Sequence, residues 1–125
     1  MIDETRIHNW LAAYRHAWST DDPSEIAALF AEDARYFTAP YSAPLEGVRA
    51  IADYWVGERE SVLPWSFEYQ ALAQEGDLYV VRAVTTYPQG TSDAEGPETF
   101  SNLWLVTLGG DGRAREFVEY FMLVE

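Results

Sequence analysis

The chain has 125 residues, of which 48% are hydrophobic and 15% aromatic, so we expect one folded domain over residues 1–125. Its formal net charge of −13 argues against binding to nucleic acid or to an anionic membrane surface, because both need Lys and Arg side chains. The absence of cysteine excludes disulfides and thiolate metal ligands. No signal-peptide pattern or membrane-length apolar run is visible, so the cytoplasm is the expected compartment.

The first half of the chain predicts three helices. Residues 3–19 carry apolar side chains at helical spacing: Ile7, Trp10, Leu11, Tyr14, Ala17 and Trp18. Asp22 followed by Pro23 is typical of a helix N-cap and first position, so a second helix is expected over about 23–31, with Leu29 and Phe30 on its buried face. A strand is expected over 34–38, and a third helix after Gly47.

The second half predicts strands. After Pro64 the apolar residues recur with a period of two, at Trp65, Phe67, Tyr69 and Ala71. Further strands are expected over 78–87, 98–108 and 114–124, with a hairpin turn at residues 109–112. Helices followed by hairpin-connected strands indicate an α+β fold. Three helices laid on one curved antiparallel sheet would form a cone, and its mouth would be a natural small-molecule pocket.

This order of elements, centred on AWSTDDPSEIAALFAEDARYFTAPYSAPLEGVRAIADYW, resembles the nuclear transport factor two-like superfamily. More narrowly, it is similar to the SnoaL-like and ketosteroid isomerase-like members over essentially the whole chain. The resemblance implies a cystatin-like α+β roll, a hydrophobic pocket and a homodimer that pairs through the convex face of the sheet. The superfamily includes isomerases, cyclases, dehydratases, epoxide hydrolases and non-catalytic modules, so the resemblance alone does not specify a reaction.

Four positions compare with the ketosteroid isomerases. Tyr14 matches their oxyanion-hole tyrosine, and Trp55 stands where they have a supporting tyrosine. Thr38 falls at their aspartate base, and Trp104 near their second oxyanion donor. A threonine hydroxyl cannot shuttle a proton near neutral pH, which argues against the steroid isomerase reaction itself.

Glu119 is the candidate acid or base. It lies between Phe117 and Phe121, where aromatic surroundings would raise the pKa of a carboxyl group. The opposite parity would instead turn Glu116, Val118 and Tyr120 inward and leave Glu119 in solvent, and the sequence leaves both open. The remaining candidates are read as ligand-binding residues: Trp18, Thr38, Trp55, Asn102, Trp104 and Phe117.

Two functions follow from these residues. The first is a cofactor-independent isomerase or cyclase-type enzyme that moves a proton on a compact hydrophobic carbonyl or hydroxyl compound, with Tyr14 as hydrogen-bond donor and Glu119 as acid or base. The alternative is a non-catalytic dimeric binding or association module, whose cone would be filled by Trp18, Trp55 and Trp104. His8 and His16 lie eight residues apart, a spacing that cannot make a metal pair, so no metal site is expected.

Overall fold

The computed structural model describes residues 2–18, 20, 22–62, 66–87 and 96–124. These residues form three helices, α1 (Glu4–Trp18), α2 (Pro23–Ala27) and α3 (Val48–Val62). They also form six strands: β1 (Phe30–Phe37), β2 (Leu45–Glu46), β3 (Ser66–Glu75), β4 (Leu78–Tyr87), β5 (Glu98–Leu108) and β6 (Ala114–Leu123). The α+β class predicted from the sequence is confirmed.

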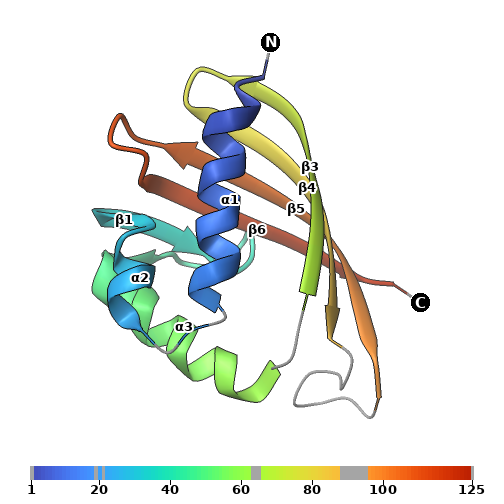
Figure 1. The fold of residues 1–125 in the computed structure, drawn as a ribbon. Helices are drawn as coiled ribbons and strands as arrows, with labels where there is room; N and C mark the ends of the chain where they lie inside the picture. Colours follow the sequence, from blue (N-terminus) through green and yellow to red (C-terminus); the bar gives the residue numbers. More distant parts are fainter. Residues whose placement is uncertain (1, 19, 21, 63–65, 88–95, 125) are drawn as a thin grey trace.

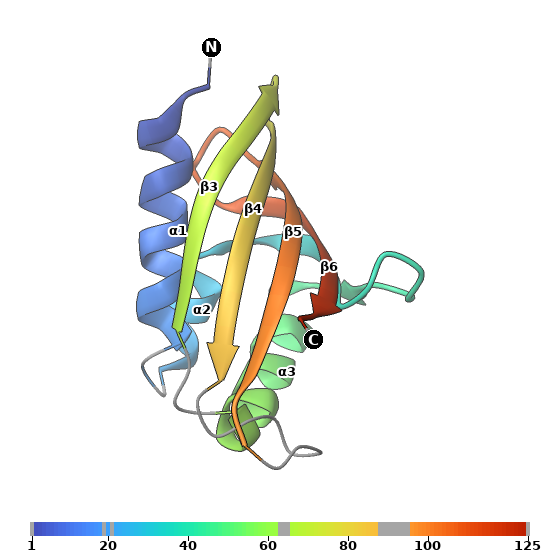
Figure 2. The same cartoon turned by 90° about the vertical axis from the view of Figure 1, so that its right-hand side faces the viewer.

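The six strands make one curved sheet in the order β2-β1-β6-β5-β4-β3. Neighbouring strands are antiparallel except β1 and β6, which pair in parallel. The parallel pair departs from the fully antiparallel sheet that was predicted. It arises because β6, which follows the meander of β3, β4 and β5, pairs with β1 from the first part of the chain. All three helices lie on the inner side of the curve, with α1 crossing the face of the sheet (Figures 1 and 2).

The second helix is shorter than predicted. Its N-cap is confirmed, since the Asp22 carboxylate accepts a 2.9 Å hydrogen bond from the backbone N–H of Ser24. The helix ends at Ala27, however, and β1 begins at Phe30, which pairs with Ala114. The carbonyl of Leu29 accepts a 2.7 Å bond from the N–H of Ala114, so pairing with β6 overrides the local helical pattern. Leu29 and Phe30 are buried as predicted, but not on a helix.

The later elements agree closely with the predicted boundaries. β4 and β5 span residues 78–87 and 98–108 as expected, and the turn at residues 109–112 closes with Gly112 at φ +82°. The guanidinium group of Arg6 donates a 2.8 Å bond to the carbonyl of Gly109, which ties α1 to this turn. The two-residue strand β2 was not predicted, and Trp65 lies outside the described residues.

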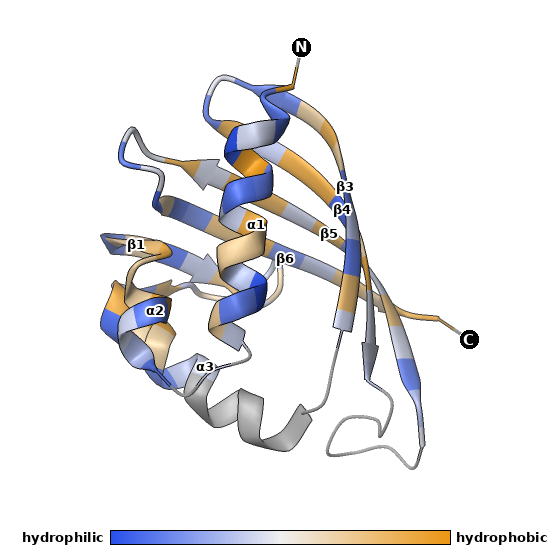
Figure 3. Ribbon diagram, in the orientation of Figure 1, coloured by the Kyte–Doolittle hydropathy of each residue, from blue (hydrophilic) through white to orange (hydrophobic). Residues whose placement is uncertain are grey.

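The core lies between the helices and the concave face of the sheet. Hydrophobic and hydrophilic residues alternate along the strands, because successive side chains of a strand point to opposite faces of the sheet (Figure 3). The largest fully buried side chains include Trp55, Trp104, Tyr79, Phe30 and Phe117. No described helix is both long enough and apolar enough to cross a membrane.

Candidate functional site

Glu119 lies on the concave face of the sheet. In the pairing of β5 with β6, Trp104 stands opposite Glu119 and Val106 opposite Phe117. Trp104, Val106 and Phe117 are all buried, and Phe117 is 0% exposed. Because alternate residues of a strand point to the same face, Glu119 points inward with Phe117. The structure therefore decides between the two parities that the sequence left open.

The Glu119 carboxylate belongs to a chain of hydrogen bonds that crosses three strands. The side-chain nitrogen Nδ2 of Asn102 on β5 donates to Glu119 Oε2 at 3.2 Å. The hydroxyl of Thr85 on β4 donates in turn to Asn102 Oδ1 at 2.8 Å. Thr85 and Asn102 are the two buried polar residues of the described core, 3% and 7% exposed. Asn102 was predicted as a ligand-binding residue, whereas Thr85 was not predicted.

Burial raises the pKa of Glu119 to about 7. The hydrogen bond from Asn102 and the nearby indole N–H of Trp104 lower it, but by less than burial raises it. The indole is close enough to act on the charge, yet its Nε1 does not meet hydrogen-bond geometry with any described residue. A carboxyl group with this pKa can gain or lose a proton near neutral pH.

Tyr14 faces the same interior from α1. Burial raises the pKa of its phenol well above the ordinary value, and the negative charge of Glu119 raises it further. Its ring lies edge-on to Trp55 at 4.9 Å between centroids and 5.4 Å from the ring of Trp104. Tyr14 is therefore a neutral hydroxyl donor at physiological pH, within electrostatic reach of the carboxylate.

A second buried tyrosine, Tyr36 on β1, was missed as a site residue. Its ring stacks on Phe117 with centroids 4.9 Å apart and an angle of 6° between the planes. Burial raises its pKa well above the ordinary value, with smaller contributions from Tyr14 and Glu119. Tyr36 shares its strand face with buried Ala34, and this alternation was the one signal that could have placed it inward.

The predicted tryptophans fill much of the interior. Trp18 and Trp55 are buried and stacked, with ring centroids 4.7 Å apart. The ring of Trp104 lies 5.9 Å from that of Phe117 and 5.4 Å from that of Tyr14, measured between centroids. The structure thus gathers every predicted site residue except Thr38 around one aromatic interior. Thr38 follows directly after β1, is half-buried and is not part of the hydrogen-bonded chain at Glu119.

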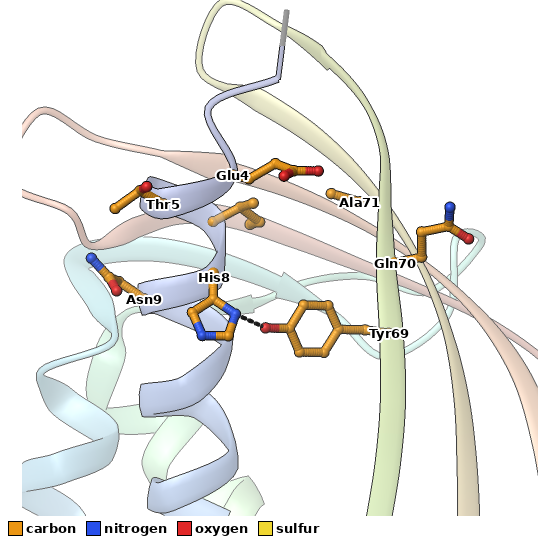
Figure 4. Close-up of a pocket in the computed structure, with 8 residues that line it drawn as sticks. Glu4, Thr5, His8, Asn9, Tyr69, Gln70 and Ala71 are labelled. Carbon is orange, nitrogen blue, oxygen red and sulfur yellow. Dashed lines mark hydrogen bonds between the residues drawn. The ribbon is translucent and has the colours of Figure 1, made fainter.

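A separate groove lies between α1 and β3 (Figure 4). Its volume is about 460 Å³, and none of the predicted site residues lines it. His8 and Tyr69 form a side-chain hydrogen bond across it, so His8 is a surface residue as expected. Among the residues that the structure describes, no group of three or more His, Cys, Asp or Glu side chains is placed to hold a metal ion.

The family profile of the SnoaL-like domain matches residues 11–117, which include both Tyr14 and Phe117. The chain belongs to the SnoaL-like domain family. The resemblance inferred from the sequence is thereby confirmed. A comparison of this SnoaL-like protein with curated proteins gives no match.

Solved structures similar to this SnoaL-like protein share its fold. One is a protein with a ketosteroid isomerase-like fold from Catenulispora acidiphila in complex with trimethylamine, 19% identical, with 89% and 83% of the two chains covered and a TM-score of 0.74. Another is SalBIII, an epoxide hydrolase/cyclase-like enzyme in salinomycin pyran ring formation. It is 18% identical, with 98% of this chain and 95% of SalBIII covered and a TM-score of 0.75. A third, from Silicibacter pomeroyi, has a cystatin-like fold. It is 20% identical, with 97% of this chain and 79% of that protein covered and a TM-score of 0.65. At these identities the likeness establishes the fold alone.

Proposed function

We propose that this SnoaL-like protein catalyses proton transfer on a compact, hydrophobic carbonyl or hydroxyl compound, with Glu119 as the acid or base and Tyr14 as the hydrogen-bond donor. The observation that carries the proposal is the inward-facing Glu119 carboxylate, whose pKa of about 7 lies close to that of a working acid–base group. Proton transfer between a carboxyl group and a carbon or oxygen atom needs no cofactor or metal. SalBIII, described as epoxide hydrolase/cyclase-like, has the same fold and is consistent with this class of chemistry.

The proposed step uses the two groups in different ways. The ionised Glu119 takes a proton from the carbon next to a carbonyl group, and the electrons of the broken C–H bond move onto the carbonyl oxygen. Tyr14 donates a hydrogen bond to that oxygen and keeps its own proton, because its raised pKa holds the phenol in the neutral form. Glu119 then returns the proton to a different atom of the same compound. The isomerised product forms without a co-reactant, and the enzyme regains its starting state.

The buried aromatic residues around Glu119 and Tyr14 indicate the substrate class. Tyr14, Tyr36, Trp55 and Trp104 are all buried and present rings and neutral polar tips. Such surroundings favour an apolar ligand with few polar groups, because a charged group away from the Tyr14 hydroxyl would lose its hydration without gaining a partner. The expected ligand is therefore small, neutral and hydrophobic.

The test uses one variant for each role and a phenolate or enolate mimic as probe. Glu119→Gln removes the titrating group and is expected to abolish turnover while leaving probe affinity within a few fold. Tyr14→Phe loses a hydrogen bond to a charged oxygen, which is worth roughly 1.5–3 kcal/mol, so probe affinity should fall about 10- to 100-fold. Glu116→Gln is the matched control, since Glu116 lies on the same strand but pairs with Arg35.

The NMR titration of Glu119 supplies an independent test of the proposal. A carboxyl resonance that titrates near 7 supports the proposed role. A titration like that of an exposed glutamate, together with no binding of any phenolate probe, would remove the catalytic proposal.

One observation favours a second function, a non-catalytic binding or association module. The stacked Trp18 and Trp55 rings and the ring of Trp104 pack around Tyr14, as expected for a filled cone. In that case Tyr14→Phe should lower thermal stability but change no ligand affinity. A wild-type protein that binds the phenolate probe through Tyr14 would instead contradict the module.

We also infer a homodimer that pairs through the convex face of the sheet. That face carries apolar side chains on adjacent strands: Leu103 and Leu105 on β5, and Val118, Tyr120 and Met122 on β6. Tyr120 and Met122 are exposed, 40% and 72%. A contiguous apolar face of this kind is typical of an interface between subunits.

A further inference from the structure

The hydrogen-bonded chain at Glu119 contains a residue to which the proposed reaction gives no role. Thr85 comes from β4, Asn102 from β5 and Glu119 from β6, so three neighbouring strands each supply one member. Thr85 is 3% exposed and stands between a valine-rich stretch and the end of its strand. A buried hydroxyl must find a partner, and that of Thr85 donates to the oxygen of the Asn102 side chain.

The direction of the Asn102 amide follows from the groups at its two ends. An ionised carboxylate offers only acceptors, so the amide must turn its NH₂ group, not its oxygen, toward Glu119. The amide oxygen then points at Thr85, where only a donor can satisfy it. The Thr85 hydroxyl is that donor, at 2.8 Å. The carboxylate thus selects the orientation of the amide, and the Thr85 hydroxyl stabilises that orientation by satisfying the amide oxygen.

The other polar groups near Glu119 cannot replace this arrangement. Tyr14 from α1 and Tyr36 from β1 are neutral phenols that act on Glu119 through space, without a hydrogen bond to it among the described residues. Trp104 from β5 presents an indole N–H that does not meet hydrogen-bond geometry. Of the described side chains, the amide of Asn102 alone makes a hydrogen bond to the Glu119 carboxylate.

We propose that Thr85 is a positioning residue, which fixes the Asn102 amide so that its NH₂ group holds the Glu119 carboxylate in place on the concave face. This assigns Asn102 to the support of Glu119 and not to ligand binding. The inference rests on the proposed function only for why Glu119 must be held in place. The orientation of the Asn102 amide is itself a property of the folded protein. Thr85 suits the task since a β-branched side chain on a strand has restricted χ1 freedom.

The test compares three variants of neighbouring threonines. Thr85→Val keeps the shape and removes the donor to the Asn102 oxygen, so the amide is held less firmly and its NH₂ group stabilises the Glu119 carboxylate less. The Glu119 pKa, followed by NMR of labelled glutamate, should then rise by about half a unit to one unit. Thr85→Ser keeps the donor and should stay within a few tenths of the wild-type value. Thr86→Val, on the opposite face of β4 and only half-buried, should change nothing.

A wild-type measurement covers the case in which Thr85→Val fails to fold. The side-chain NH₂ protons of Asn102 should give two well-separated signals that exchange slowly with water. Rapidly exchanging, averaged NH₂ signals would overturn the inference, as would a Thr85→Val pKa equal to that of wild type or of Thr86→Val. A wild-type Glu119 that titrates like an exposed glutamate counts against the proposed function. The change caused by Thr85→Val still decides the role of Thr85.

Discussion

The sharpest prediction concerns the pH dependence of stability and the substitution Glu119→Gln. A half-buried carboxyl group whose pKa is raised on folding prefers to be protonated in the native state. The unfolded chain releases this proton near the ordinary value of 4.5, and the folded chain releases it only near 7. The stability that Glu119 contributes is therefore fully present below about pH 4.5, declines between 4.5 and 7, and is lost above 7.

The size of this effect follows from the two pKa values. Each pKa unit corresponds to about 1.4 kcal/mol, so the difference between 4.5 and about 7 sets a ceiling of about 3.5 kcal/mol on the loss. Because Glu119 is only half-buried and water can relax around it, we expect about 1–2 kcal/mol. Glutamine has nearly the same shape and does not ionise. The Glu119→Gln variant should therefore match wild type at pH 4.5 and exceed its stability by this amount at pH 8.

The assay is urea denaturation of both proteins at several values between pH 4.5 and 8. Other titrating groups affect both proteins equally, so the difference between the two stability curves isolates Glu119. Glu116→Gln makes the same chemical change on the same strand but loses the ion pair with Arg35, so as control it should not show the gain in stability at pH 8 that is expected of Glu119→Gln. Parallel curves for wild type and Glu119→Gln would refute the reasoning, because they would show that Glu119 has the same pKa in both states.

Three further predictions concern packing, the turn and assembly. Phe30→Ala should reduce the free energy of unfolding by about 3–5 kcal/mol, because Phe30 is fully buried. Glu25→Ala, at a half-buried position near the start of α2, should reduce it by under about 1 kcal/mol, and similar denaturation midpoints for the two variants would contradict this. Gly112→Ala should cost about 1 kcal/mol because Gly112 has a positive φ, whereas Gly110→Ala should be neutral in the same thermal melts; two neutral variants would show that the turn adapts. Sedimentation at micromolar concentration should show a dimer, which Leu103→Glu on the convex face dissociates; a monomeric wild type would exclude this interface.

The strands were predictable from sequence because their alternation is strong. Residues 78–87 and 98–108 gave the bounds of β4 and β5 directly. The boundary of α2 was not, because Leu29 and Phe30 continue the apolar spacing of the helix. Their backbone instead pairs with Ala114, more than eighty residues further along the chain. A local pattern carries no information about a partner so distant in sequence.

The residues of the candidate site were likewise predictable only in part. Tyr14 followed from helical spacing and from the family resemblance. The inward orientation of Glu119 did not follow from sequence, because both faces of its strand carry aromatic residues, and only the pairing with Trp104 decides it. Thr85 could not be chosen over Thr86, since two adjacent threonines look alike until the sheet assigns one of them to the core. The sequence thus predicted which residue types surround the site, and the register determines which of them meet.

The position of β6 also has a consequence for how the protein assembles. β6 is the last strand in chain order, yet it lies between β1 and β5 near the middle of the sheet. Until it inserts, two strand edges and the aromatic interior remain open, and such edges are where unfolded chains associate. Its pairing with β1 joins segments far apart in sequence, which makes this closing step intrinsically slow. Since β6 carries Glu119, the capacity to exchange a proton would arise only when the sheet closes, in the same event that completes the fold.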